Sequence, residues 1–161
     1  MSLNNEEILK KIFIILKEKS LKIATAESCT GGLISHTLTN ISGSSEFFDR
    51  GIVSYSNTAK IELLGVPDEL LEKFGAVSEQ VAKTMAEGVR KKSNVDIGIA
   101  TTGIAGPTGG TKEKPVGLVY ISISSTNNTI VKKFKFEGSR LENKESTCNA
   151  AINLLLDFIT K

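Results

Sequence analysis

Helical and strand-like patterns of apolar residues alternate along this chain of 161 residues, and that alternation constrains the fold more than any other feature. Apolar residues recur at helical spacing in residues 78–92, whereas residues 95–101 form a continuous apolar run typical of a strand buried on both faces. Strands that alternate with helices fold into a sheet with helices packed on both sides. The pattern therefore predicts an α/β domain with three layers, α/β/α.

The predicted elements follow one another without a linker or an internal repeat, so residues 1–161 are expected to form a single domain. Their order is a helix at 4–19, a strand at 22–26, a helix after Gly32, a strand at 50–56, a short helix capped by Asn57 and ended by Gly65, another between Pro67 and Gly75, a helix from Ser78 to about Lys92, a strand at 95–101, two strands at 116–125 and 129–137, and a helix at 141–160. The last two strands flank Asn127-Asn128, which predicts a hairpin. Because hairpin strands are antiparallel, the sheet is expected to be mixed.

Composition argues against several classes of protein. With 40% hydrophobic and 24% charged residues, the chain has the composition of an ordinary globular domain. A formal net charge of +2 is too small to favour binding along a nucleic acid backbone. The longest run without a charge, Ser28–Ser45, is dominated by Ser, Thr, Asn and Gly, so we expect no contact with a membrane.

The first residues and the rare residue types bear on location and chemistry. Met1–Glu7 has neither the basic segment nor the apolar core of a secretory signal, and Cys29 and Cys148 are the two cysteines, so a reducing, cytoplasmic location is expected. His36 is the one histidine and is expected to pack or to lie at the surface. A serine–histidine triad and a zinc site of several His or Cys ligands are therefore not expected.

Ser28 is the first candidate for chemistry, because it lies between the end of a predicted strand and the start of a helix. Ligands of open α/β sheets bind at this position, where the N–H groups at the helix start favour an anion or an oxyanion. The alternative interpretation is structural. Ser28 or Thr30 would then cap the helix, and Gly31 and Gly32 would permit the turn.

Lys60 is the second candidate. If Asn57 caps the helix, Lys60 lies in its first turn, where the helix dipole disfavours a cation. An ordinary surface lysine gains nothing there, but a lysine that acts as a neutral base would benefit, since burial and the dipole both lower its pKa. The alternative is a solvated lysine on a short helix.

The loop from Gly103 to Pro115 is the third candidate, since six of its thirteen residues are Gly or Pro. Glycines let backbone N–H groups approach a phosphate closely, although the segment lacks the Gly-Lys-Ser/Thr end of a P-loop. Arg140 is the fourth, because a guanidinium just past a strand end can hold a phosphate with two hydrogen bonds. Glu27 and Glu46 could hold Mg²⁺, but nothing in their spacing requires a metal.

The order of six short motifs resembles one family closely, the CinA C-terminal domain family of nicotinamide mononucleotide deamidases. The resemblance runs over about residues 6–160, and the matching motifs are Ala26-Glu27-Ser28-Cys29-Thr30-Gly31-Gly32, Gly43-Ser44-Ser45, Tyr55-Ser56-Asn57 with Lys60, Gly75-Ala76-Val77-Ser78-Glu79, Thr102-Gly103-Ile104-Ala105-Gly106-Pro107 with Gly109-Gly110, and Lys114-Pro115-Val116-Gly117.

The resemblance implies a three-layer fold with a mixed, mostly parallel five-stranded sheet. It also implies hydrolysis of the carboxamide of nicotinamide mononucleotide to give nicotinate mononucleotide and ammonia, without a metal or an organic cofactor. The implied partners are this small-molecule mononucleotide and further copies of the chain in a homo-oligomer.

The family is similar to amidohydrolases with a Ser/Lys dyad, which its motifs carry to Ser28 and Lys60. Neutral Lys60 is expected to take the proton of Ser28, which attacks the amide carbon. The other catalytic positions implied are Tyr55 and Ser45. The substrate-binding positions implied are Thr30, Gly31, Gly32, Thr102, Gly103, Gly106 and Arg140, with the first three or the Thr102–Gly106 loop holding the oxyanion and Arg140 the 5′-phosphate.

Alternatives remain at the level of sequence. Ser45 could be the nucleophile in place of Ser28. Ser139 and Lys144 stand where the family commonly has Asp and often a second Arg, and a lysine keeps the charge but loses the fork that grips a phosphate. The chain could also be a non-catalytic nucleotide-binding module of the competence/damage-inducible type, or a metal-dependent nucleotide phosphatase.

Overall fold

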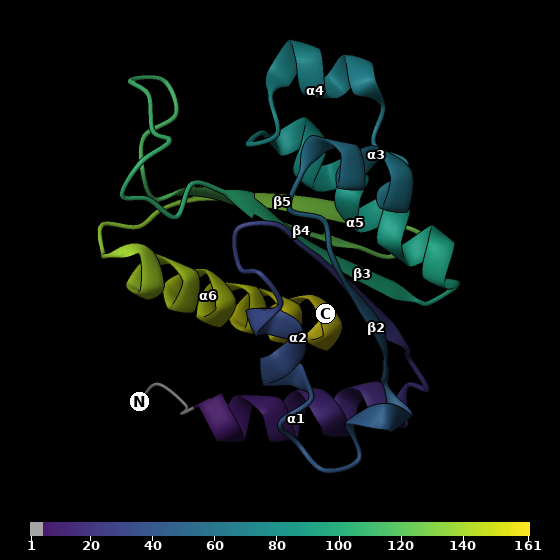
Figure 1. Ribbon diagram of the computed structural model, residues 1–161. Helices are drawn as coiled ribbons and strands as arrows, with labels where there is room; N and C mark the ends of the chain where they lie inside the picture. The colour runs from purple at the N-terminus through teal and green to yellow at the C-terminus, as the bar shows by residue number, and fades with distance from the viewer. Residues whose placement is uncertain (1–4) are drawn as a thin grey trace.

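Five strands form one mixed sheet in the computed structural model, which describes residues 5–161 (Figure 1). The strands are β1 (Ile23–Glu27), β2 (Phe48–Val53), β3 (Ile97–Gly103), β4 (Leu118–Ser124) and β5 (Thr129–Lys135), in the spatial order β2-β1-β3-β4-β5. β1 is parallel to both β2 and β3, whereas β4 is antiparallel to β3 and β5. Most of the strands thus run in one direction, and the predicted mixed, mostly parallel sheet is confirmed.

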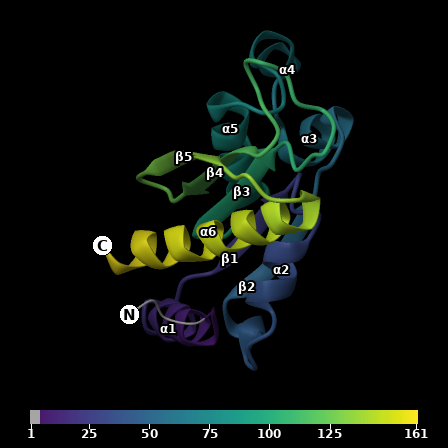
Figure 2. The same cartoon turned by 90° about the vertical axis from the view of Figure 1, so that its left-hand side faces the viewer.

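Helices cover both faces of the sheet, as Figures 1 and 2 show from two directions. The helices are α1 (Asn5–Glu18), α2 (Leu33–Leu38) and α6 (Arg140–Thr160) on one face, and α3 (Asn57–Leu64), α4 (Asp68–Phe74) and α5 (Glu79–Ser93) on the other. Each face has its own apolar core. Ile12 of α1 and Leu155 of α6 belong to one core, and Val81 and Met85 of α5 belong to the other. The predicted α/β/α layering is therefore confirmed.

β1 lies between the two cores, and all five of its residues are buried. Its side chains alternate between the layers: Ile23 joins the core beneath α1 and α6, whereas Ala24 and Ala26 join the core beneath α5. The small alanines let α5 approach the sheet, and Gly98 of β3 does the same, since a Cβ there would meet the carbonyl oxygen of Ala86 at 2.1 Å. The result is a rigid central strand whose carboxyl end carries Ser28.

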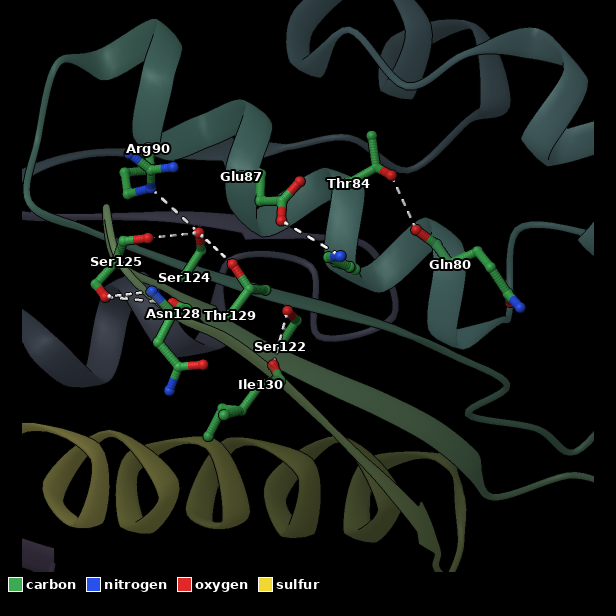
Figure 3. A network of polar contacts seen from close by, with 11 residues as sticks. Gln80, Thr84, Glu87, Arg90, Ser122, Ser124, Ser125, Asn128, Thr129 and Ile130 are labelled. Carbon is green, nitrogen blue, oxygen red and sulfur yellow. Dashed lines mark hydrogen bonds and ion pairs between the residues drawn. The ribbon is translucent and has the colours of Figure 1, made fainter.

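Polar contacts fasten α5 to the β4–β5 hairpin (Figure 3). Arg90 Nε donates to Ser124 Oγ at 3.1 Å, and Thr129 Oγ1 donates to the same oxygen at 2.8 Å. The turn itself is closed by a hydrogen bond from the N–H of Ser125 to the carbonyl of Asn128 at 2.7 Å. The hairpin predicted around Asn127-Asn128 is confirmed.

Several boundaries differ from those predicted. β2 begins and ends earlier than the predicted residues 50–56, and the chain leaves the sheet at Ser54. Ser56 caps α3 in place of Asn57 and accepts the N–H of Ala59 at 3.0 Å. β3 begins and ends two residues later than 95–101. α1 is described from Asn5 onward. The predicted start of this helix, residue 4, lies outside the described residues. Within residues 5–161, no helix is long and apolar enough to cross a bilayer.

Candidate active site

The carboxyl ends of the parallel strands β2, β1 and β3 meet at one edge of the sheet, and three candidate segments lie there. Ser28 follows β1, Tyr55 and Lys60 follow β2, and Thr102 lies at the end of β3. β1 has a parallel neighbour on each side. The chain passes from β1 to β2 on one side and later to β3 on the other side. This arrangement places the segments together where open α/β sheets bind ligands.

The side chains of Ser28 and Lys60 are in direct contact. Lys60 Nζ lies 3.0 Å from Ser28 Oγ, and it also lies 2.8 Å from the carbonyl oxygen of Ser54 and 3.3 Å from that of Tyr55. Lys60 is 1% exposed and Ser28 is 8% exposed, so the contact is shielded from bulk water. The lysine is thus not the solvated surface residue of the alternative interpretation.

Burial shifts the pKa of this lysine downward. Loss of hydration lowers the pKa of Lys60 from its ordinary value, because the charged ammonium form is the one that burial disfavours. Within residues 5–161, no carboxylate forms an ion pair with it that would reverse this effect. Lys60 is the fourth residue of α3, close to the positive end of the helix dipole, which acts in the same direction.

The turn that carries Ser28 is not built as the capping interpretation predicts. The residue at the N-cap of α2 is Gly32, with φ of 103°, and no side chain at that position caps the helix. Gly31 also has a positive φ, of 60°, and its N–H donates to the carbonyl of Ser28 at 3.1 Å. Ser28 therefore does not cap the helix, and its hydroxyl is left to Lys60.

The start of α2 is held instead by Glu27, a residue whose role sequence reasoning missed. Its buried carboxylate accepts the N–H groups of Ile34 and Ser35 and the hydroxyls of Thr30 and Ser35. Glu27 is 1% exposed, so these contacts leave it no access to a metal in solvent. The one signal in the sequence that could have indicated this role is the position of a glutamate at the end of an apolar strand.

A cavity of about 220 Å³ opens beside the Ser28–Lys60 pair. Its lining residues are Ser28, Cys29, Tyr55, Asn57, Lys60, Ala76, Val77, Thr102, Gly103, Ala105 and Arg140. The hydroxyl of Thr102 donates to the carbonyl of Ala76 at 2.8 Å and so holds the Gly75–Val77 segment as one wall. Lys114 donates to the carbonyl of Phe74 and ties the glycine-rich loop to the same wall.

Arg140 and Tyr55 meet at the mouth of this cavity. Arg140 Nη2 donates to the hydroxyl of Tyr55 at 2.9 Å, and Nη1 donates to the carbonyl of Gly106 at 2.7 Å. Asn143, buried one turn further along α6, donates to the carbonyl of Ala105 at 3.0 Å. The start of α6 thus holds both the glycine loop and the exposed ring of Tyr55 in place.

Comparison with known proteins places this chain in a family. Residues 5–159 match the CinA C-terminal domain family. This chain belongs to that family. The resemblance found in its motifs is therefore confirmed.

Individual relatives of this CinA domain agree with the assignment. The CinA-like protein of Syntrophus aciditrophicus is 49% identical over 157 residues, which are 97% of this chain and 37% of that protein. The chain thus spans little more than a third of the length of such relatives. The competence/damage inducible protein CihA from Agrobacterium tumefaciens has a crystal structure that matches this one with a TM-score of 0.94. Its sequence is 42% identical to this chain, and the match covers 100% of both chains. A CinA superfamily protein from Enterobacter cloacae is 33% identical with a TM-score of 0.95, over 99% of this chain and 94% of its own.

The fold of the CinA domain does not bring every predicted residue to the cavity. Ser45 is exposed in a short 3-10 helix (Ser44–Glu46) before β2, whereas Ser28 follows the carboxyl end of β1. The N–H of Ile23 at the amino end of β1 bonds to Phe47, so Ser45 lies by the opposite end of that strand. Within one chain the structure therefore favours Ser28 over Ser45.

The remaining candidates lie elsewhere or have other partners. His36 lines a separate cavity of about 680 Å³ between α1 and α2. Glu46 pairs with Lys17 at 3.2 Å. In the part of the chain that the structure describes, no cluster of His, Cys, Asp or Glu is arranged to hold a metal ion. Cys29 also lines the cavity, and burial raises the pKa of its thiol to about 12. Lys60 Nζ hydrogen-bonds to Ser28 Oγ, so Ser28 is the residue of the two that has a base beside it.

Proposed function

We propose that this CinA domain is a metal-independent amidohydrolase that converts nicotinamide mononucleotide to nicotinate mononucleotide and ammonia. The observation that carries the proposal is the buried contact of 3.0 Å between Lys60 Nζ and Ser28 Oγ. A serine needs a base within hydrogen-bond reach to act as a nucleophile, and Lys60 is the ionisable group in that position.

The partners of Lys60 suit a neutral amine. A neutral amine has two N–H bonds and one lone pair. The carbonyl oxygens of Ser54 and Tyr55 accept the two N–H bonds, which turns the lone pair toward the hydroxyl of Ser28. As an ammonium, Lys60 donates to Ser28 Oγ; once Lys60 has lost a proton the direction reverses, and Ser28 donates its hydrogen to Lys60 as general-base catalysis requires.

The reaction follows from this pair in two halves. Ser28 Oγ bonds to the carboxamide carbon while its proton passes to Lys60, and the ammonium of Lys60 then gives the proton to the amide nitrogen, which leaves as ammonia. Water next attacks the acyl-enzyme ester and passes a proton through Lys60 back to Ser28 Oγ, which releases the nicotinate product. The sum is one amide and one water consumed, and one carboxylic acid and one ammonia formed.

The oxyanion of each tetrahedral intermediate needs donors beside Ser28. Among the predicted donors, the N–H of Gly31 is bonded to the Ser28 carbonyl and that of Ile104 to the Leu118 carbonyl, whereas the N–H groups of Thr30, Gly32, Ala105 and Gly106 have no acceptor within residues 5–161. Of these four residues, Ala105 lines the cavity and the others do not. The N–H of Ala105 is therefore the donor that we assign to the oxyanion.

The cavity is large enough for only one part of the substrate. At about 220 Å³ it falls below the roughly 300–1,000 Å³ of cavities that enclose a whole ligand, so it accommodates the pyridine ring and its carboxamide. The ribose and the 5′-phosphate then extend past the mouth toward Arg140. Lys144 adds a second cation one helical turn away, with its Nζ 3.5 Å from where a Cβ of Gly31 would lie.

The test is release of ammonia from nicotinamide mononucleotide by the purified protein in the presence of EDTA. Wild type is expected to release ammonia, and Ser28→Ala and Lys60→Ala are each expected to lose several orders of magnitude in kcat while keeping the far-ultraviolet circular dichroism of wild type. Ser45→Ala serves as the matched serine control and is expected to lose far less.

Other outcomes would point to other functions. Binding of the mononucleotide without turnover would favour the non-catalytic nucleotide-binding module. Activity that EDTA abolishes would favour a metal-dependent nucleotide hydrolase. A comparable kcat/KM for free nicotinamide and for its mononucleotide would contradict the role given to Arg140 and the glycine loop.

A further inference from the structure

Glu27 is a buried carboxylate that the proposed reaction does not use. It is the last residue of β1, immediately before Ser28, and it is 1% exposed. Burying a carboxylate is unfavourable unless hydrogen bonds replace its hydration. Within residues 5–161 Glu27 forms no ion pair, so its hydrogen bonds alone balance that penalty.

The two carboxylate oxygens hold the two sides of the turn that follows β1. Oε1 accepts the hydroxyl of Thr30 at 2.6 Å and the N–H of Ile34 at 2.8 Å. Oε2 accepts the N–H of Ser35 at 3.0 Å and its hydroxyl at 2.7 Å. One side chain therefore joins the turn to the first residues of α2.

α2 depends on such an external cap. It has six residues, and Gly32 at its N-cap offers no side chain to the free N–H groups of the first turn. Glu27 satisfies two of those groups, and its negative charge is favoured beside the positive end of the helix. The cap thus comes from the strand before the turn instead of from the turn itself.

The turn has little rigidity of its own. Gly31 and Gly32 both have a positive φ, which glycine adopts readily but from which it also departs readily. The hydroxyl of Thr30 links Glu27 to Thr101 of β3, whose carbonyl accepts the N–H of Ser28 at 3.1 Å. The sheet thus holds the N–H of Ser28, whereas its carbonyl is held by the N–H of Gly31, in the turn that Glu27 fastens through Thr30 and α2.

We propose that Glu27 is a positioning residue that holds the hydroxyl of Ser28 against Lys60 by capping α2 across the intervening turn. This inference rests on the proposed Ser28–Lys60 amidohydrolase. Glu27 does not touch the substrate, so its removal changes the rate of attack by Ser28 more than the affinity for the substrate.

Glu27→Gln is the variant that tests this role, because it keeps the size of the side chain. The amide nitrogen must replace one of the two oxygens, and it then faces the N–H of either Ile34 or Ser35, donor against donor. A displacement of about 1 Å at the reacting atom lowers a rate by about 100-fold. We expect kcat to fall by roughly 10- to 100-fold, with KM within about threefold of wild type.

Two readouts allow the role of Glu27 to be tested separately from the identity of the substrate. The first is kcat and KM with nicotinamide mononucleotide. The second is the rate at which a fluorophosphonate forms a phosphonate ester with Ser28 and releases fluoride, followed by intact mass, since this step needs only an activated serine. Both rates are expected to fall together in Glu27→Gln, and the pH dependence is expected to stay that of wild type because the surroundings of Lys60 are unchanged.

Controls distinguish positioning from loss of stability. Leu155→Ala removes a fully buried core side chain of α6 away from the cavity and is expected to lower the melting temperature without lowering kcat. If Glu27→Gln does not fold, Thr30→Val and Ser35→Ala each remove one hydroxyl donor from the same carboxylate, and each is expected to slow the labelling of Ser28 severalfold.

The inference is overturned if folded Glu27→Gln keeps both rates within twofold of wild type, or if its defect lies in KM alone. If Glu27→Gln does not fold, the inference is overturned when neither Thr30→Val nor Ser35→Ala slows the labelling of Ser28. If wild type reacts with the fluorophosphonate but releases no ammonia from the mononucleotide, the proposed substrate is wrong and the labelling rates still decide the role of Glu27. If wild type neither reacts with the fluorophosphonate at Ser28 nor releases ammonia from the mononucleotide, both proposals fail.

Discussion

Arg140 Nη2 donates a hydrogen bond of 2.9 Å to the hydroxyl of Tyr55, two residues that are 85 positions apart in the sequence. The bond joins the first residue of α6 to the segment that follows β2, and the same guanidinium holds the carbonyl of Gly106. Arg140, which sequence analysis assigned to the phosphate alone, thus also holds Tyr55 at the mouth of the cavity. A phosphate that binds Arg140 must share it with these two partners or displace one of them.

Substitution of Arg140 tests this arrangement. Arg140→Lys keeps the charge but cannot reach two acceptors in a fixed fork, so we expect KM for nicotinamide mononucleotide to rise about tenfold, by the loss of about one charge-assisted hydrogen bond. Steady-state kinetics measures the change. Arg50→Lys is the matched control, because Arg50 pairs with Asp49 on the exposed strand β2 away from the cavity. An equal KM for Arg140→Lys and wild type would contradict the role of the guanidinium.

The pH dependence of turnover is expected to report Lys60. Because burial lowers the pKa of Lys60 from 10.5, the neutral base becomes available at a lower pH than for an ordinary lysine. kcat/KM is therefore expected to rise with pH and to reach a plateau below pH 10.5. Lys60→Arg, which stays charged, is expected to be inactive throughout. A plateau reached only above pH 10.5 would show that Lys60 is not shifted.

The buried lysine is also expected to reduce stability. Its folded-state pKa lies below its unfolded-state pKa, so between these two values the unfolded chain binds more protons and the free energy of unfolding rises with pH. Lys60→Met, of similar length, removes this dependence. We expect Lys60→Met to melt at a higher temperature than wild type at pH 7, with the difference shrinking toward pH 10, as differential scanning calorimetry measures. A lower melting temperature for Lys60→Met at pH 7 would contradict the expectation.

The thiol of Cys29 is expected to be unreactive although it lines the cavity. A pKa of about 12 leaves roughly a thousandfold less thiolate at pH 8 than a pKa near 9 does. Iodoacetamide is therefore expected to leave both the mass and the activity of the folded protein unchanged over the time in which an unfolded sample is alkylated at Cys29 and Cys148. Rapid inactivation with one alkyl group on Cys29 would contradict the burial.

Much of the fold could be predicted because its signals are local. The helical period of α5 and the apolar run of β3 each lie within one segment, and Asn127-Asn128 marks the hairpin turn. Boundaries were less well predicted where a tertiary contact decides them. β2 ends at Val53: the N–H of Ser54 still bonds to Glu27 of the neighbouring β1, but the carbonyl of Ser54 accepts Lys60 Nζ at 2.8 Å.

The candidate site could be predicted only in part. Ser28, Lys60 and Arg140 were found from their motifs, and the cavity brings them together. Ser45 also belongs to a motif, but it lies by the other end of β1, because a motif gives identity and order without giving distance.

Local patterns in the sequence were sufficient to predict the order of helices and strands, the family and the residue types available for chemistry, since periodicity and motifs are properties of neighbouring residues. Packing in three dimensions was needed to bury Lys60 against Ser28, to let Glu27 cap α2 and to bring Arg140 to Tyr55. Each of these contacts depends on how strand ends and helix ends are brought together in space. The hydration that Lys60 loses on burial, and with it the lowered pKa, exists only once the layers have packed.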